Sequence, residues 1–299
     1  MVASAGVIID PDRCDGCGVC LRVCPARAFS LVAGRAGLTG ECRLGCDHCA
    51  AACPRAAITV EIPEPESFAF AGFEPSVGPE RRPVALADLV ALMRVRRSCR
   101  VYRDGEVPLS QLADLVRIAI TAPSGTNSQL WSFTIIPTRE KMLLFGRAVA
   151  AFYERLNRLA AKAWLRKLLK ICGRRELDDY YREYYASVCE GLESWRQGSD
   201  DRLFHGAPAA ILVASRPGAS CPVEDALMAS QNIVLAAESM GLGSCLIGFA
   251  VEALRRDRRV GAVLGIPSQE KVHAVIALGR PAVSFRRPAA RRRAPVRIV

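Results

Sequence analysis

The chain has 299 residues, of which 51% are hydrophobic and 24% are charged, a composition typical of folded rather than disordered proteins. At ~100–200 residues per domain, this length corresponds to about two domains. No apolar run approaches the ~20 residues that a membrane-spanning helix needs, and the N-terminus lacks the basic and apolar regions of a secretory signal. We therefore expect a cytoplasmic protein with no membrane partner.

The net charge of +11 is unevenly distributed along the chain. Residues 1–60 hold six Arg against five acidic residues, whereas the segment after Pro281 holds six Arg and no acid. A basic tail can bind nucleic acid, but it is more often solvated or a local phosphate contact. Because no helix-turn-helix or aromatic-interleaved basic pattern accompanies it, we expect no nucleic-acid partner. A redox sensor that controls nucleic-acid binding stays the alternative function.

Eight of the thirteen cysteines form an internal repeat near the N-terminus. The first half reads C-x2-C-x2-C-x3-C-P from Cys14 to Pro25, and the second reads C-x3-C-x2-C-x3-C-P from Cys42 to Pro54. A reducing compartment keeps such thiols free for ligation. Structural zinc sites usually pair two separated C-x2-C units, whereas three cysteines crowded on one loop surround a cubane cluster. The spacing favours two iron-sulfur clusters over two zinc sites.

This repeat resembles the bacterial-type ferredoxins with two [4Fe-4S] clusters, over about residues 8–60. The resemblance implies that the fourth cysteine of each half binds the other half's cluster. The implied ligands are Cys14, Cys17, Cys20 and Cys53 for one cluster, and Cys42, Cys46, Cys49 and Cys24 for the other. The spacing between Cys42 and Cys46 is one residue longer than the common pattern. We interpret residues 1–60 as a two-cluster ferredoxin-like domain.

The remaining chain predicts a linker and a second domain of mixed helix and strand. Five prolines between Pro63 and Pro83 indicate an extended linker over residues 61–83. Residues 84–299 then alternate apolar helical spacing, as at 86–93, with short β-prone runs. Ser110 is the expected N-cap of a second helix. The expected strands are 131–136, 210–214 and 272–278, a buried helix covers 225–240, and a polar helical insert covers 140–204. The fold class expected for the whole chain is α+β.

Four ordered motifs in this second domain resemble the nitroreductase family of FMN enzymes. Its R-x-S-x-R signature is matched at Arg96–Arg100, and its P-S-x-x-N-x-Q-P-W signature at Pro123–Trp131, with Leu130 in place of the second proline. Its G-L-G signature lies at 241–243, and its closing L-G-Y-P segment is matched by L-G-R-P at 278–281. The resemblance implies a nitroreductase-like α+β domain that binds FMN in a homodimer. The absence of a G-x-G-x-x-G turn argues against a Rossmann domain.

The resemblance also implies individual FMN contacts. Arg96, Ser98 and Arg287 would hold the phosphate, for which guanidinium and hydroxyl donors are suited. Arg100 and Asn127 would serve the pyrimidine edge of the ring, which gains negative charge on reduction. No catalytic residue is assigned, and His205 and His273 are expected to do no chemistry. The full set of expected cofactor contacts is Arg96, Arg97, Ser98, Arg100, Asn127, Gln129, Gly243, Ile247, Gly248 and Arg287.

The insert carries four tyrosines at helical spacing, Tyr180, Tyr181, Tyr184 and Tyr185. Such a stripe favours packing or a subunit interface, and the alternative is a lid that stacks on a planar substrate. Together the two domains predict an oxidoreductase that passes electrons from clusters to FMN and on to a nitroaromatic, quinone or activated alkene. The donor would be a ferredoxin-like carrier or NAD(P)H. Reductive dehalogenation and flavin modification stay open within the same fold.

Overall fold

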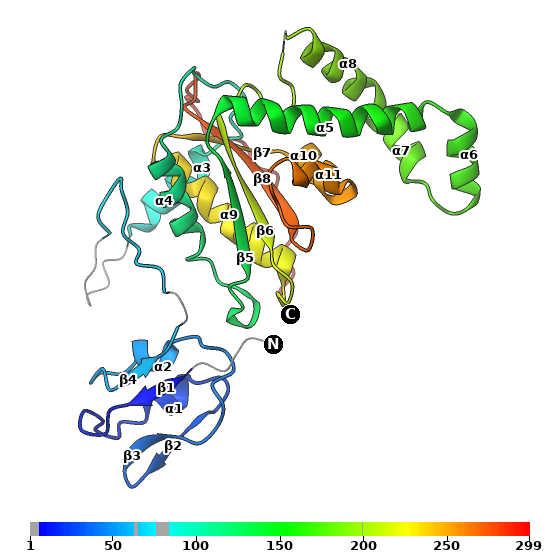
Figure 1. Ribbon diagram of the computed structural model, residues 1–299. Helices are drawn as coiled ribbons and strands as arrows, with labels where there is room; N and C mark the ends of the chain where they lie inside the picture. The colour runs from blue at the N-terminus through cyan, green and yellow to red at the C-terminus, as the bar shows by residue number, and fades with distance from the viewer. Residues whose placement is uncertain (1–5, 63–64, 76–83, 199) are drawn as a thin grey trace. The chain divides into compact units, whose positions relative to one another are not determined.

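The computed structural model describes residues 6–62, 65–75, 84–198 and 200–299, and its chain divides into two compact units (Figure 1). The first unit contains the described residues up to Ala69 and the short segments Pro123–Leu130 and Gly218–Cys221. The second contains Phe70–Ala122, Trp131–Pro217 and Pro222–Val299. No described helix is long and apolar enough to cross a membrane.

The first unit consists of two antiparallel strand pairs and two short helices. One pair joins β1 (Val7–Ile9) to β4 (Ile58–Val60), and the other joins β2 (Phe29–Val32) to β3 (Arg35–Leu38). The helices α1 (Val19–Val23) and α2 (His48–Ala51) each contain one cysteine of the repeat. The small core gathers Cys20, Ala28, Phe29, Cys49, Ile58 and Val60. Because so few apolar side chains are buried, ligands at the cysteines have much to contribute to the stability of this unit.

The second unit is built on a four-stranded antiparallel sheet. Its strand order is β5 (Trp131–Ile136), β6 (Ala209–Ser215), β8 (Lys271–Gly279) and β7 (Gly243–Leu246). All seven residues of β6 are buried. Since successive side chains point to opposite faces of a sheet, helices must cover both faces at its centre.

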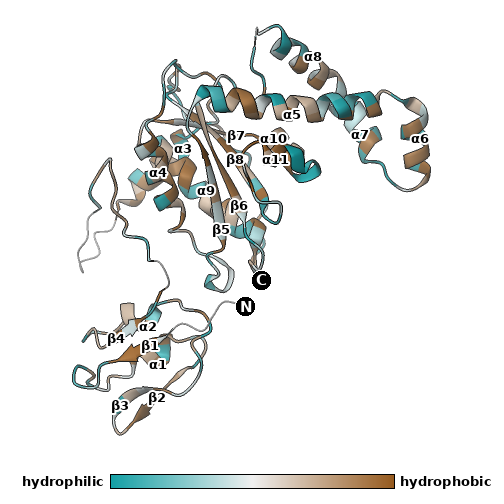
Figure 2. Ribbon diagram, viewed as in Figure 1, coloured by the Kyte–Doolittle hydropathy of each residue, from teal (hydrophilic) through white to brown (hydrophobic). Residues whose placement is uncertain are grey.

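Two helical layers provide this cover (Figures 1 and 2). On one face, α4 (Leu109–Ala119) and α9 (Pro222–Ser239) pack against the side chains of Ile211 and Ile276. On the other, α5 (Arg139–Ala160), α10 (Gly248–Arg256) and α11 (Arg258–Ala262) pack against Leu212 and Val275. The helix α3 (Leu86–Val95) contacts α9 but buries no residue of its own. This mixed arrangement of helices and sheets is the α+β class that the sequence predicted.

Two local expectations differ from the structure. Ser110 is not an N-cap, because α4 begins one residue earlier and Pro108, with φ of −53°, stands at its cap. The first helix of the expected insert, α5, belongs to the core, since Met142, Phe145 and Val149 face the sheet. The remaining insert helices bury no residues: α6 (Ala163–Ile171), α7 (Glu176–Glu183) and α8 (Tyr185–Arg196).

Part of the expected linker, residues 63–64 and 76–83, lies outside the described residues. The described residues 65–75 form no helix or strand. Within them, the backbone N–H groups of Ala71 and Gly72 donate to the carboxylate of Asp114 on α4 at 3.0–3.1 Å. Asp114 is fully buried, so these charge-assisted bonds attach the end of this segment to the second unit.

A seventh segment, residues 98–103, runs along the β7 edge of the sheet. Cys99 N–H donates to the carbonyl of Ser244 at 2.9 Å, and Arg103 N–H donates to the carbonyl of Arg280 at 2.8 Å. This approach is close enough that a Cβ atom on Gly243 would lie 2.7 Å from the side chain of Cys99. Glycine at 243 is therefore required by the packing of this segment.

We predict that Gly243→Ala lowers the free energy of unfolding by about 1–3 kcal/mol, the usual cost of overpacking a tight contact. Urea unfolding followed by tryptophan fluorescence measures it, since all three Trp lie in the second unit. Gly191→Ala on α8 is the control, because its nearest neighbour would be Arg202 at 3.8 Å. Equal stability of the two variants would contradict the packing role of Gly243.

Candidate functional site

The structure brings the eight cysteines of the repeat together in two sets, each around its own small cavity in the first unit. Cys14, Cys17, Cys20 and Cys53 line one cavity, and Cys24, Cys42, Cys46 and Cys49 line the other. These are the same two sets that the ferredoxin resemblance implies, and each takes its fourth cysteine from the opposite half of the repeat. Among the described residues, no group of three or more His, Cys, Asp or Glu side chains is close enough to hold a single metal ion.

Backbone N–H groups point at several of these sulfurs. Ala28 N–H donates to Cys24 Sγ, Ala36 N–H to Cys14 Sγ and Ala57 N–H to Cys53 Sγ, at 3.3–3.4 Å. Hydrogen bonds of this kind stabilise thiolate ligands and tune the potential of a cluster. Burial raises the pKa of the Cys20 and Cys49 thiols. Four sulfurs around a cavity, with N–H donors toward them, fit a cluster in each set.

In the second unit, the segment 96–100 lies against β7 and the chain that follows β8. Ser98 pairs with Ser244 in a parallel bridge, and Arg97 Nη2 donates to the carbonyl of Arg287 at 2.9 Å. The Arg97 guanidinium also stacks over the ring of Phe285, 5.1 Å from its centroid. Three motifs that are far apart in the sequence therefore meet at one edge of the sheet.

Arg97 carries an incomplete set of partners at this edge. Its Nε is buried and has no hydrogen-bond partner among the described residues. A buried guanidinium donor without a partner is costly unless a ligand satisfies it. An anionic group is the ligand that suits a guanidinium best, so this edge fits a phosphate.

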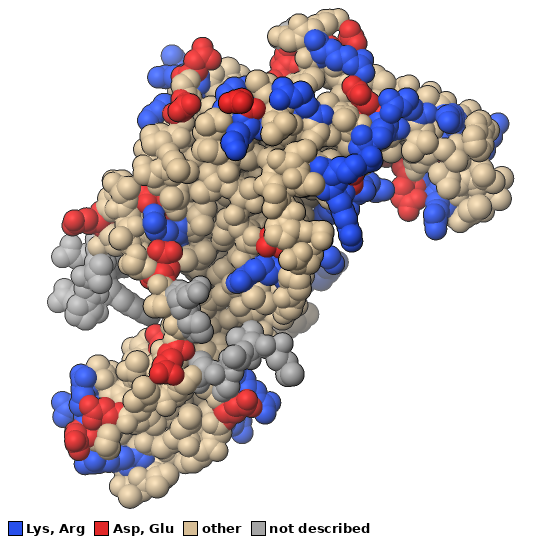
Figure 3. Space-filling model, viewed as in Figure 1, with Lys and Arg blue, Asp and Glu red and all other residues tan. Residues whose placement is uncertain are grey.

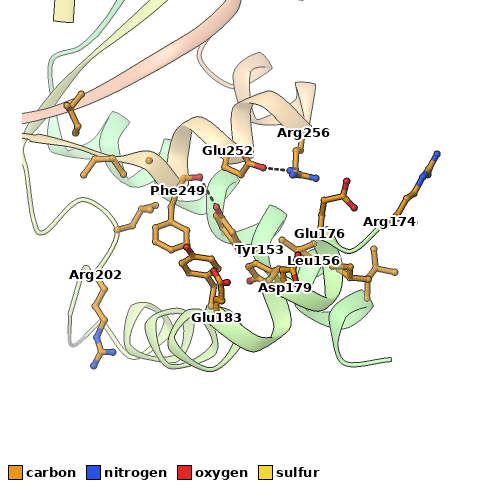
Figure 4. A pocket seen from close by; sticks show the side chains of 18 of the residues that line it. Tyr153, Leu156, Arg174, Glu176, Asp179, Glu183, Arg202, Phe249, Glu252 and Arg256 are labelled. Atoms are coloured by element: carbon orange, nitrogen blue, oxygen red, sulfur yellow. Dashed lines mark hydrogen bonds and ion pairs between the residues drawn. The ribbon is translucent and has the colours of Figure 1, made fainter. Parts of the chain in front are cut away.

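A cavity of about 1080 Å³ lies beside this edge (Figure 4). Among the expected cofactor residues, Arg100, Ile247 and Gly248 line it. A Cβ atom added at Gly248 would meet nothing within 4 Å, so the backbone there faces open space. The cavity is of the size of sites that hold drug-sized or larger ligands.

The helical insert supplies the aromatic wall of this cavity. Tyr153, Tyr180, Tyr184 and Phe249 line it and contact one another with ring centroids 5.6–6.4 Å apart. The Tyr153 hydroxyl donates to the carbonyl of Phe249 at 2.9 Å, the contact drawn in Figure 4. Offset and edge-to-face contacts at these distances are favourable, so the wall offers ring faces to a planar ligand.

The two other tyrosines of the stripe have a packing role. Tyr181 and Tyr185 contact each other at 4.7 Å, and the Arg166 guanidinium lies 3.5 Å from the ring of Tyr181. The stripe therefore divides between the two functions that the sequence left open. One pair faces the cavity and the other pair holds α7 against α6.

Asn127 and Gln129 belong to the first unit, in the segment Pro123–Leu130. Gln129 Nε2 donates to Asn127 Oδ1 at 3.1 Å, and Asn127 Nδ2 donates to the carbonyls of Leu44 and Gly45. Thr126, Asn127 and Gln129 have φ between 49° and 54°. Left-handed backbone at three non-glycine residues so close together costs free energy and is typical of functional loops.

The sequence did not identify three further residues of the cavity wall, namely Cys245, Phe249 and His205. Cys245 and Phe249 flank the expected contact residues Ile247 and Gly248 along the chain, which was the signal available for them. Burial is the largest cause that lowers the pKa of His205, with the nearby Arg100 adding to it. His273, in contrast, is away from the cavity and pairs through Nε2 with Ser215 Oγ at 2.8 Å.

Comparison with protein families matches residues 93–280 to the Nitroreductase family and residues 7–30 to a 4Fe-4S binding domain. A 4-nitrobenzoate reductase of Nocardioides sp. is 30% identical over 63% of this chain and 78% of its own length. An iodotyrosine deiodinase of Thermotoga neapolitana is 26% identical over 64% of this chain and 88% of its own length.

Among solved structures, a nitroreductase of Bacteroides fragilis with bound FMN covers 71% of this chain and 98% of its own. Its TM-score is 0.51 at 23% sequence identity, a likeness of fold. The family match spans more than half of the chain and contains the sheet, its edge and the aromatic cavity. The chain therefore belongs to the nitroreductase family, as an oxidoreductase with an N-terminal 4Fe-4S binding domain.

Proposed function

We propose that this chain carries electrons from two [4Fe-4S] clusters to FMN and on to a small planar acceptor. Nitroaromatics, quinones and activated alkenes are the acceptor classes. The observation that carries the proposal is the combination, in one nitroreductase-family chain, of two four-cysteine cavities with a large cavity lined by Arg100 and Gly248. When bound, the clusters supply single electrons and FMN converts them to two-electron chemistry.

The FMN phosphate is assigned to Arg96, Arg97, Ser98 and Arg287. The support for this assignment is the edge where Arg97 meets the chain at Arg287, and the buried Arg97 Nε that has no partner among the described residues. A phosphate dianion there would accept from guanidinium and hydroxyl donors at once. Arg97 is held in place by Phe285, so its donors are oriented before the ligand binds.

The flavin ring is assigned to Arg100, Asn127, Gln129, Gly243, Ile247 and Gly248. Arg100 is an exposed cation on the cavity wall, where it can stabilise negative charge at the pyrimidine edge. The open space beside Gly248 lets a ring approach the backbone. The aromatic wall opposite would orient a planar acceptor and exclude water from it.

Relatives bear on the acceptor and on the donor. The 4-nitrobenzoate reductase favours a nitroaromatic acceptor, and the iodotyrosine deiodinase favours a halogenated aromatic as the second candidate. A relative named NADH dehydrogenase, from Thermus thermophilus, is 29% identical over 67% of this chain and favours NADH as the competing donor. We propose a homodimer that takes electrons through the clusters from a ferredoxin-like carrier.

The first prediction concerns the clusters as the point of electron entry. The full-length protein is expected to hold about eight iron and eight sulfide per chain, four of each per cluster. Cys14→Ser should remove about half of this iron and slow flavin reduction by reduced ferredoxin, while reduction by NADH stays unchanged. Iron and sulfide analysis and stopped-flow spectroscopy measure the two effects.

Cys172→Ser is the matched control, because Cys172 is exposed and lies outside the repeat. Stoichiometric zinc without sulfide would contradict the cluster assignment. An unchanged rate with reduced ferredoxin in Cys14→Ser would contradict the clusters as the entry route.

The second prediction concerns the phosphate contact. Arg287→Ala removes one charge-assisted contact worth about 1.5–3 kcal/mol, so FMN should bind about ten- to a hundredfold more weakly. Riboflavin lacks the phosphate and should bind equally well to both proteins. Fluorescence titration of the two flavins measures this, with Arg297→Ala in the same basic tail as the control. If both flavins weaken equally, Arg287 does not contact the phosphate.

The third prediction concerns the aromatic wall. Tyr184→Leu removes a ring face from the cavity, and aromatic contacts are worth about 0.5–1.5 kcal/mol. The KM for a nitroaromatic acceptor should therefore rise about two- to tenfold. Tyr181→Leu on the same helix is the control, because Tyr181 packs against Arg166 instead of lining the cavity. Equal KM values for the two variants would show that the wall does not contact the acceptor.

A further inference from the structure

The segment that carries α6 is the most basic part of the second unit. Between Glu154 and Glu176 the sequence holds eight Lys or Arg and no acidic residue. Figure 3 shows these cations as blue atoms around the end of the molecule that α6 forms, with tan surface between them. A helix that combines such charge with apolar residues is amphipathic in the sense of surface-binding helices.

The apolar residues of α6 divide between two faces of the helix. Leu165 and Leu169 line the cavity. Trp164, Leu168 and Ile171, spaced four and three residues apart, form a stripe that does not line it, and they are 64%, 51% and 84% exposed. Residues at this spacing lie on one face of a helix. This outer stripe, Trp164–Leu168–Ile171, is large, contiguous and uncovered in the described chain.

The cations beside the outer stripe are largely unpaired. Lys162, Lys167, Arg174 and Arg175 have no ion-pair partner among the described residues, since the pairs recorded near α6 are those of Arg166 and Lys170 with Asp178. That carboxylate is shared further with Arg182.

The acidic residues of the neighbouring helix α7 are directed elsewhere. Glu176, Asp179 and Glu183 line the cavity (Figure 4). The outer stripe of α6 therefore borders positive charge, while the nearby negative charge is either neutralised or faces the cavity.

We propose that α6 binds the surface of an anionic phospholipid bilayer through its outer stripe. The apolar stripe would enter the boundary of headgroups and acyl chains, where Trp is favoured. The flanking cations would attract anionic headgroups, at about 1 kcal/mol, or about fivefold in affinity, for each Lys or Arg near the surface. This binding is peripheral, and it differs from the sequence expectation of no membrane partner, which rested on the lack of a spanning segment.

A second copy of the chain is the other occupant that the stripe could take. A symmetric contact through α6 would place two of these basic segments against each other, which like-charge repulsion disfavours. An anionic lipid surface complements both the apolar stripe and its cations. Because Leu165 and Leu169 of the same helix line the cavity, such binding would bring the cavity to the lipid surface.

The test is co-sedimentation of the full-length protein with vesicles. Vesicles of phosphatidylglycerol and phosphatidylcholine should bind the protein at least tenfold more tightly than pure phosphatidylcholine, and salt should weaken this binding. Leu168→Glu and Ile171→Glu should each lower the affinity at least tenfold, and Lys167→Gln about fivefold. Leu109→Glu on α4 is the control, because it changes a similarly exposed leucine, 59% exposed, away from α6.

Circular dichroism and analytical ultracentrifugation of each variant separate lipid binding from folding and assembly. Folded variants of unchanged mass that no longer bind anionic vesicles support the proposal. Wild-type protein that binds neither vesicle, or binds both equally, overturns it. It is also overturned if Leu168→Glu lowers the mass of the assembly while vesicle binding persists, since the stripe would then be a subunit interface.

Discussion

The close approach of residues 98–103 to the β7 edge is the constraint on which the candidate flavin site depends. Gly243 has no side chain because Cys99 occupies the space, and a Cβ atom on Gly279 would lie 2.7 Å from both Pro208 and Tyr102. With these two glycines, the segment bonds to Ser244 on one side and to Arg280 on the other. Three stretches distant in the sequence are thereby held at one edge, where arginines from two of them meet.

The sheet and its helices position the cavity relative to this edge. Burial of both faces of β6 requires α5 on one side, and α5 then continues to Ala160 and carries the helices α6–α8. Buried Asn157 near the end of α5 joins them, accepting from the Tyr180 hydroxyl at 2.7 Å and donating to Cys189 Sγ at 3.3 Å. The aromatic wall is thus attached to the core by a polar contact as well as by its rings.

The two faces of α6 show how one helix can serve two purposes. Its inner leucines complete the cavity and its outer stripe stays exposed. The positive charge beside that stripe has no counterpart within the described chain, whereas the carboxylates of α7 are paired or face the cavity. Charge and apolar surface are therefore sorted by side of the insert, which gives the second unit an outer face distinct from its redox site.

The sequence by itself determined the features that depend on local spacing. The cysteine repeat grouped its ligand sets correctly as cavities, because three thiols within one loop cannot separate far. The β-rich run at 131–136 coincides with β5, since burial on a sheet selects such residues. The four flavin motifs placed the chain in its family because their order and residue types are distinctive even without a known geometry.

Only the tertiary structure decided the features that depend on packing between distant segments. The core position of α5 followed from contacts with β6 and β8 that helical periodicity does not reveal. The division of the tyrosine stripe between the cavity and Arg166, and the exposure of Trp164, Leu168 and Ile171, depend on which neighbour covers each face. A sequence pattern identifies the apolar side of a helix, but the surface that covers it is set by residues far away in the chain.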